Sequence, residues 1–153
     1  MTRRTFARAA AGVLALALAR PRAALAQADG DSELIAALIE LERRLERAYG
    51  AAGSATDKLF ATHSREHAEG LEQALRNRGG RPPERPPAAG GAPLELEARA
   101  VASCHRAIGE LRDGRLLPTF AAIMANHGQH LVVLRERAGR DPIPAAFETG
   151  RVQ

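Results

Sequence analysis

Two histidines three residues apart, His127 and His130, lie in the segment ANHGQHL, whose other residues follow an apolar helix face. Residues three or four apart lie on the same side of an α-helix, so both imidazoles could bind one metal ion. His63 and His67, four residues apart, form a second pair of this kind. A single histidine in such a place is more often a hydrogen-bonded core residue than a ligand, so a metal site requires further ligands.

Two glutamates also fall on apolar helix stripes. Glu42 follows Leu38 by four residues and precedes Leu45 by three, and Glu97 precedes Val101 by four. A carboxylate buried without a partner is costly, and a cation held between several helices would compensate all of these polar groups together. The alternative is that both glutamates are surface residues paired with neighbouring arginines.

Helical periodicity is strong in four segments, and no segment alternates as a strand would. Asp31 or Ser32 is expected to cap the first helix. The segment GGRPPERPPAAGGAP, residues 79–93, is rich in proline and glycine and is expected to form a long crossover without a helix. The four predicted helices cover residues 31–52, 56–78, 94–111 and 116–137.

Short links after the first and third helices make each pair antiparallel. The sequence therefore predicts an all-α protein, a four-helix bundle of two helical hairpins joined by one long crossover. The C-terminal tail, residues 139–153, is expected to lie across the bundle, held by Ile143 and Phe147. Cys104, the single cysteine, is expected to be buried and unreactive.

The two hairpins are similar to each other in sequence. LERRLERAY (41–49) aligns with LEARAVASC (96–104), and SREHAEGL (64–71) aligns with HGQHLVVL (127–134). The alignment pairs His67 with His130 and Ser64 with His127. Each hairpin thus brings one glutamate and one histidine inward, which suggests a site with approximate twofold symmetry.

These segments resemble the ferritin-like superfamily, especially small exported ferritin-like domain proteins of bacteria. The resemblance covers nearly all of residues 27–153 and also includes the tail DPIPAAF. It implies a ferritin-like bundle in which Glu42 and Glu97 match the lone glutamates of the di-metal members, and His67 and His130 match the histidines of their Glu-x-x-His motifs. Ser64 and His127 stand where those motifs have glutamates, which argues against a standard di-iron ferroxidase.

The expected function is binding of a metal ion inside the bundle. Two carboxylates with several imidazoles suit zinc, copper, nickel or a single iron better than a pair of ferric ions, and iron, zinc and copper are the ions expected. Two alternatives remain open: a metal-free bundle acting through a partner or as a homo-oligomer, and a metal-dependent oxidase or peroxide-handling enzyme. A non-catalytic metal-binding protein is preferred because two motif carboxylates are missing. The candidate ligands are Glu42, His67, Glu97, His127, His130 and His63.

The first 26 residues have the composition of an export signal, with a basic start, a short apolar run and small residues before Gln27. TRRTF resembles a twin-arginine signal, which implies recognition by an export machinery and a periplasmic or secreted protein. Five of the 22 basic residues lie in this segment with no acidic residue, so the remainder has 17 basic and 18 acidic residues. The positive charge therefore belongs to the signal, and nucleic-acid binding is not expected.

Overall fold

The structure is a computed structural model that describes residues 22–84, 90–144 and 149–150. The described chain is helical, with no strand, which confirms the all-α fold class. Residues 1–21 of the predicted export signal lie outside the described residues, and its expected cleavage position, Ala26–Gln27, lies within the first helix. The elements are α1 (Arg22–Ala52), α2 (Ala55–Asn77), α3 (Pro93–Glu110), the short 3₁₀ helix η1 (Gly114–Leu116) and α4 (Leu117–Arg137).

The boundaries of α2 follow from the residues at its ends. The Ser54 hydroxyl accepts a hydrogen bond from the Asp57 backbone N–H, and the Asp57 carboxylate accepts one from the Ser54 N–H. This reciprocal pair satisfies two N–H groups that the helix start leaves free. Beyond the last turn, Gly79 has a φ of 80°, a backbone conformation that glycine adopts without strain. The helix therefore ends at the start of the proline-rich crossover.

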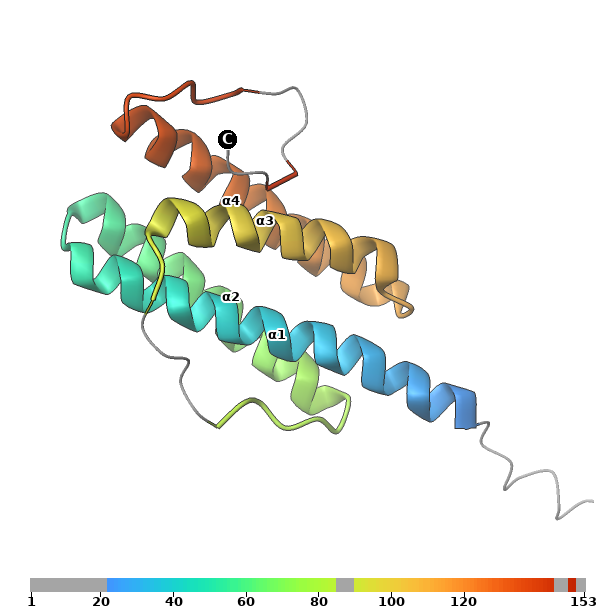
Figure 1. Cartoon of the computed structure of the whole chain (residues 1–153). Helices are drawn as coiled ribbons and strands as arrows, with labels where there is room; N and C mark the ends of the chain where they lie inside the picture. The colour runs from blue at the N-terminus through green and yellow to red at the C-terminus, as the bar shows by residue number, and fades with distance from the viewer. Residues whose placement is uncertain (1–21, 85–89, 145–148, 151–153) are drawn as a thin grey trace, which may run out of the picture.

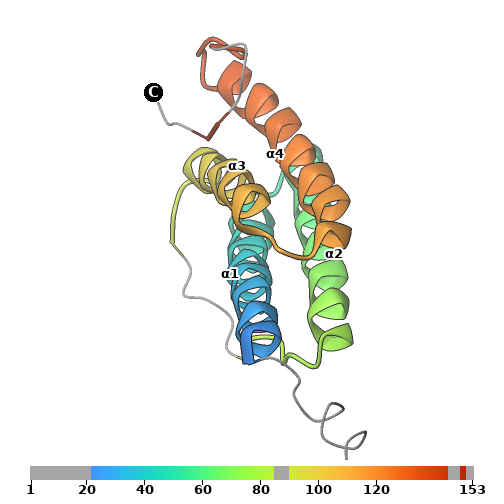
Figure 2. The same ribbon diagram turned by 90° about the vertical axis from the view of Figure 1, so that its right-hand side faces the viewer.

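The helices form two hairpins, α1 with α2 and α3 with α4 (Figure 1). The described parts of the crossover follow the end of α2 and precede the start of α3. α1 packs against both α2 and α3, and α3 packs against α4. The view turned by 90° shows α1 and α2 side by side, with α4 inclined to them (Figure 2). The predicted arrangement of two hairpins and one crossover is present, although residues 85–89 of the crossover are outside the described part.

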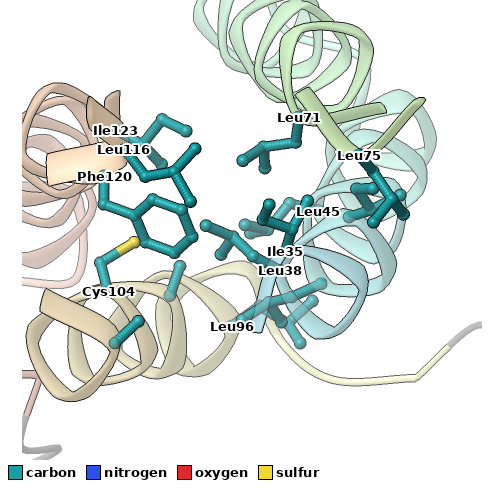
Figure 3. Close-up of a cluster of buried hydrophobic side chains, with 14 of the residues drawn as sticks. Ile35, Leu38, Leu45, Leu71, Leu75, Leu96, Cys104, Leu116, Phe120 and Ile123 are labelled. Atoms are coloured by element: carbon teal, nitrogen blue, oxygen red, sulfur yellow. The ribbon is translucent and has the colours of Figure 1, made fainter. Parts of the chain in front are cut away.

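The apolar core lies between the two hairpins and receives side chains from all four α-helices (Figure 3). Their helical spacing places them on inward stripes, as the periodicity predicts. Cys104 is fully buried among them, and burial raises the pKa of its thiol to about 12. Prominent members of the core are Ile35, Leu38, Leu45, Leu71, Leu75, Leu96, Leu116, Phe120 and Ile123.

Asp31 does not cap a helix, so that prediction is wrong. α1 begins at Arg22, which places Asp31 inside the helix with its side chain 2% exposed. Its carboxylate accepts hydrogen bonds from the backbone N–H groups of Arg112 and Asp113 and from the Arg78 guanidinium, each 3.0 Å long. Asp31 therefore ties α1 to the end of α2 and to the link between α3 and α4.

The tail departs from its predicted contacts. Ile143 is 67% exposed, and its backbone N–H donates a hydrogen bond to the Asp141 carboxylate. Phe147 lies outside the described residues. Gly150 instead touches α3, where a Cβ would collide with the backbone at Ala98 and Ala102. The expected anchoring by Ile143 is therefore wrong.

Candidate metal centre

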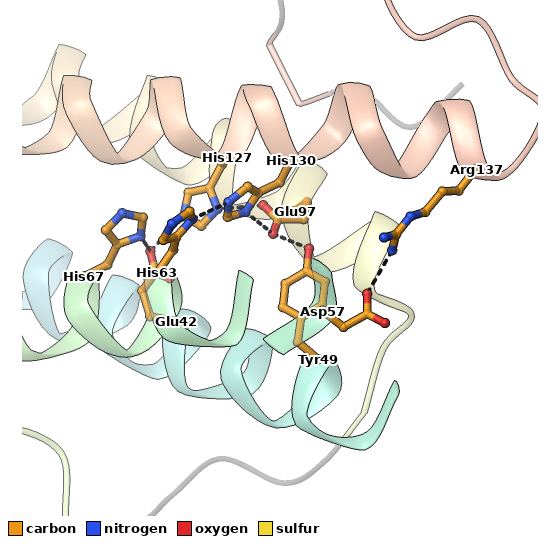
Figure 4. Close-up of polar contacts among 9 residues, drawn as sticks. All are labelled: Glu42, Tyr49, Asp57, His63, His67, Glu97, His127, His130 and Arg137. Carbon is orange, nitrogen blue, oxygen red and sulfur yellow. Dashed lines mark hydrogen bonds and ion pairs between the residues drawn. The ribbon is translucent and has the colours of Figure 1, made fainter. Parts of the chain in front are cut away.

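Five of the six candidate ligands converge in the middle of the molecule (Figure 4). α1 contributes Glu42, α2 contributes His67, α3 contributes Glu97, and α4 contributes both His127 and His130. Glu42, Glu97 and His127 are completely buried, and His130 is 2% exposed. The expectation that these side chains point inward on four different helices is confirmed. The alternative of surface glutamates paired with arginines does not apply.

His127 joins the two carboxylates. Its Nδ1 lies 2.6 Å from Glu97 Oε2, and its Nε2 lies 2.7 Å from Glu42 Oε1. A carboxylate can only accept, so both ring nitrogens carry protons and the imidazole is positively charged in the metal-free protein. The buried centre is thus a Glu–His–Glu bridge that spans the two hairpins.

This bridge shifts the pKa values of all three groups. Burial alone would lower the pKa of His127, but the charges and hydrogen bonds of Glu42 and Glu97 raise it to about 10. Burial raises the pKa of both carboxyls, and His127 more than offsets this effect at Glu42. At Glu97 the hydrogen bonds from His127 and His130 hold the pKa at about 2. Both glutamates are therefore charged at neutral pH.

Glu97 has hydrogen-bond donors on both oxygens. The Tyr49 hydroxyl donates to its Oε1 over 2.5 Å, and His130 Nδ1 approaches the same oxygen to 2.9 Å. The other nitrogen of His130 is 2.9 Å from Nδ1 of His63, which is partly buried and extends the chain of bonds towards the surface. Phe60 stacks on the His130 ring with centroids 3.8 Å apart. These contacts fix His130 and saturate Glu97.

The Glu42 end is less complete. Glu42 Oε2 and the Ser64 hydroxyl are buried with no hydrogen-bond partner among the described residues. His67 Nδ1 lies 3.3 Å from Glu42 Oε1, which is an ion-pair distance and not a hydrogen bond. A buried carboxylate oxygen without a partner carries a desolvation cost. Three buried polar atoms without a hydrogen-bond partner among the described residues thus lie on α1 and α2: Glu42 Oε2, Ser64 Oγ and His67 Nδ1.

Two groups of these side chains could hold a metal ion. One is Glu42, His67 and His127, and the other is Glu97, His127 and His130. Within each group the potential ligand atoms lie within 4.8 Å of one another. Both groups use His127, whose two nitrogens face opposite ends. His63 belongs to neither group, and it contacts the centre through the hydrogen bond to His130 and by stacking on the same ring, with centroids 5.2 Å apart.

The symmetry in the sequence is only partly kept. Glu42 pairs with His67 and Glu97 with His130, one pair in each hairpin, as the alignment suggests. Ser64 and His127, however, break the symmetry because only His127 reaches both carboxylates. The sequence carries no signal that Glu97 is saturated while Glu42 is not, since that difference arises from Tyr49 crossing to the other hairpin.

No protein-family model, curated protein or solved structure matches this chain. No described helix has the length and apolar character needed to cross a membrane.

Proposed function

We propose that this protein binds one divalent metal ion through Glu42, His67 and His127, as an exported bundle of the ferritin-like kind. The observation that carries the proposal is Glu42 Oε2, which is fully buried without a hydrogen-bond partner among the described residues. Its other oxygen faces imidazole nitrogens of two further helices, at 2.7 Å and 3.3 Å. An ion bound there would give the unpartnered carboxylate oxygen a positive charge to interact with and would use nitrogen and oxygen donors of types that zinc and iron accept.

The ligand spacing supports this assignment. Bonds of 2.0–2.2 Å around a tetrahedral ion place neighbouring ligand atoms about 3.4 Å apart. The distance between His67 Nδ1 and Glu42 Oε1 is already 3.3 Å. The distance between His127 Nε2 and Glu42 Oε1 is 2.7 Å, because a proton joins these atoms in the metal-free protein, and it would lengthen when an ion replaces that proton.

Glu97 has a different role in this proposal. A histidine that binds a metal usually donates its other N–H to a carboxylate, which fixes the ring and its tautomer. Glu97 Oε2 accepts such a bond from His127 Nδ1, while Tyr49 and His130 occupy its Oε1. Glu97 is therefore a positioning residue that orients His127 towards the ion.

The charge balance also favours a divalent ion. Glu42 and Glu97 carry two negative charges, and doubly protonated His127 carries one positive charge. Glu42, Glu97 and His127 together therefore carry one net negative charge in the metal-free centre. A divalent ion in place of the His127 Nε2 proton would make the buried centre neutral, which is the least costly state in a low-dielectric interior.

A metal-dependent oxidase is the second candidate. Two histidines and one carboxylate that leave coordination positions open are a set used by iron enzymes that react with O₂. The same set binds zinc, so iron, zinc and copper remain in competition on ligand type alone. Consumption of O₂ or peroxide by the iron-loaded protein, lost in Glu42→Gln, would support the oxidase. Stoichiometric binding without turnover would support a binding protein.

The test is the metal content of untagged protein after supply of iron, zinc or copper. We expect about one ion per chain in the parent, and loss of that ion in Glu42→Gln and in His67→Ala. His105→Ala is the matched control, because His105 is an exposed histidine outside the centre. A parent that holds no stoichiometric ion under any supply would refute the proposal and favour a metal-free bundle with a hydrogen-bonded polar core.

The export route is part of the same proposal. The TRRTF segment resembles a twin-arginine signal, whose pathway carries folded proteins, so an ion could be bound before export. Replacement of Arg3 and Arg4 by lysine should retain the protein in the cytoplasm. Unchanged export of that variant would argue against this route.

A further inference from the structure

A groove of about 460 Å³ separates α2 from α4 on the flank of the molecule. Four residues of each helix line it, and among the described residues these two helices do not pack closely along their backbones. α1 with α2, α1 with α3 and α3 with α4 all make extensive contacts. The α2–α4 flank is therefore the open side of the helical assembly.

The groove reaches the candidate metal centre at His67. His67 lines the groove and is 18% exposed, whereas its partners Glu42 and His127 are completely buried. One residue thus belongs both to a solvent-accessible surface and to the buried ligand group. An ion approaching along the groove would meet His67 before it met the other two ligands.

The opposite end of the centre is closed by its own contacts. His63 is partly buried there, but its Nδ1 is engaged with His130, and Phe60 stacks on the His130 ring. Behind His130, Glu97 is saturated by Tyr49 and the two imidazoles of α4. An ion entering on that side would have to break these hydrogen bonds.

Two small residues face the groove from opposite walls, Gly70 on α2 and Ala122 on α4. A Cβ added at Gly70 would meet no atom within 4 Å. Glycine inside a helix is less favourable than alanine, so a side chain here would favour the helix. A Cβ can therefore be added at this position without a collision.

We propose that the α2–α4 groove is the entrance by which a divalent ion reaches Glu42, His67 and His127, with His67 as the first ligand it contacts. This inference rests on the proposed metal binding. It adds a route, and a route governs the rate of loading without altering the equilibrium affinity, because entry and exit are slowed by the same factor.

The test is the rate at which metal-free protein takes up Co²⁺, followed by stopped-flow absorption, together with the equilibrium affinity from a chelator competition. Gly70→Met places a long side chain in the groove, and Gly50→Met is the matched control, an exposed helical glycine of α1 that also has open space around it. We expect Gly70→Met to load at least about tenfold more slowly, equal to about 1.4 kcal/mol of added barrier, with unchanged affinity. Gly50→Met should load like the parent.

If folded Gly70→Met takes up Co²⁺ at the parental rate, the proposal that the groove is the entrance would be overturned. Ala122→Met on the opposite wall provides a second variant in case Gly70→Met does not fold, and it should slow loading in the same way. A parent that takes up no Co²⁺ would overturn the proposed metal binding itself, and the entrance with it. If Co²⁺ binds normally and neither groove variant slows its uptake, the entrance proposal alone would be overturned.

Discussion

Tyr49→Phe is expected to destabilise the metal-free protein by removing one hydroxyl. The Tyr49 side chain is completely buried, and its hydroxyl donates to Glu97 Oε1 over 2.5 Å. Phenylalanine keeps the ring, which packs edge-on against Phe60 with centroids 5.4 Å apart. The substitution thus removes this one hydrogen bond between the hairpins and keeps the ring packing around it.

The magnitude follows from the partners that remain. A hydrogen bond to a charged group contributes about 1.5–3 kcal/mol. Glu97 Oε1 still has His130 Nδ1 at 2.9 Å, so the oxygen does not lose all of its donors. We therefore expect a loss near the lower limit, about 1.5 kcal/mol, which corresponds to a fall of roughly 1 M in the urea midpoint.

The assay is urea unfolding of the protein in the presence of a chelator, followed by far-ultraviolet circular dichroism. The same substitution in a Glu97→Gln background is the control, because a neutral amide accepts a weaker bond from the hydroxyl. The loss should be clearly smaller in that background. An unchanged midpoint for Tyr49→Phe, or an equal loss in both backgrounds, would refute the idea that this hydrogen bond stabilises the centre.

Three further outcomes are expected. The pKa of His127 is raised to about 10, so the metal-free protein should lose stability as pH rises from 6.5 towards 10. The pKa of Glu97 is lowered to about 2, so stability should also fall as pH drops from 4.5 towards 2. Urea midpoints measured across pH test this, and a flat profile would contradict both pKa shifts. Asp31→Ala removes three hydrogen bonds of 3.0 Å and should lower the stability of the protein by about 3 kcal/mol. Ser54→Ala at the start of α2 should lower it by about 1 kcal/mol. Equal losses of stability in thermal unfolding would argue against the role of Asp31 in joining the helices. The Cys104 thiol, fully buried with a pKa of about 12, should react with a thiol reagent only as fast as the protein unfolds, and rapid labelling of the native protein would show that the core is open.

Much of the fold could be predicted from the sequence because its signals are local. Apolar periodicity and the proline-rich segment 79–93 defined four helices and one crossover, and α2, α3 and α4 agree with their predicted ranges to within a residue or two. The start of α1 and the role of Asp31 could not be predicted in this way. The Asp31 carboxylate is used by residues more than 40 positions away, and that contact exists only after the hairpins pack.

The members of the candidate site could be predicted from the sequence, except that His63 lies in neither ligand group, but their hydrogen-bond partners could not. Glu42, Glu97 and the histidines of α4 fall on inward stripes, and helix geometry alone brings them to the centre. Which carboxylate is saturated depends on Tyr49 crossing between hairpins, and on His127 reaching both glutamates at once. Distances of this kind depend on how the helices are inclined to one another, and sequence spacing does not encode that angle.

The position of the ion itself tests the central claim most directly. Crystals of the protein grown with Zn²⁺ or Co²⁺ would show it in an anomalous-scattering map. We predict one strong peak per chain, with bonds of about 2.0–2.2 Å to Glu42, His67 and His127 and with Glu97 still bonded to the far nitrogen of His127. A peak between Glu97 and His130, or no peak at a saturating metal concentration, would contradict the account.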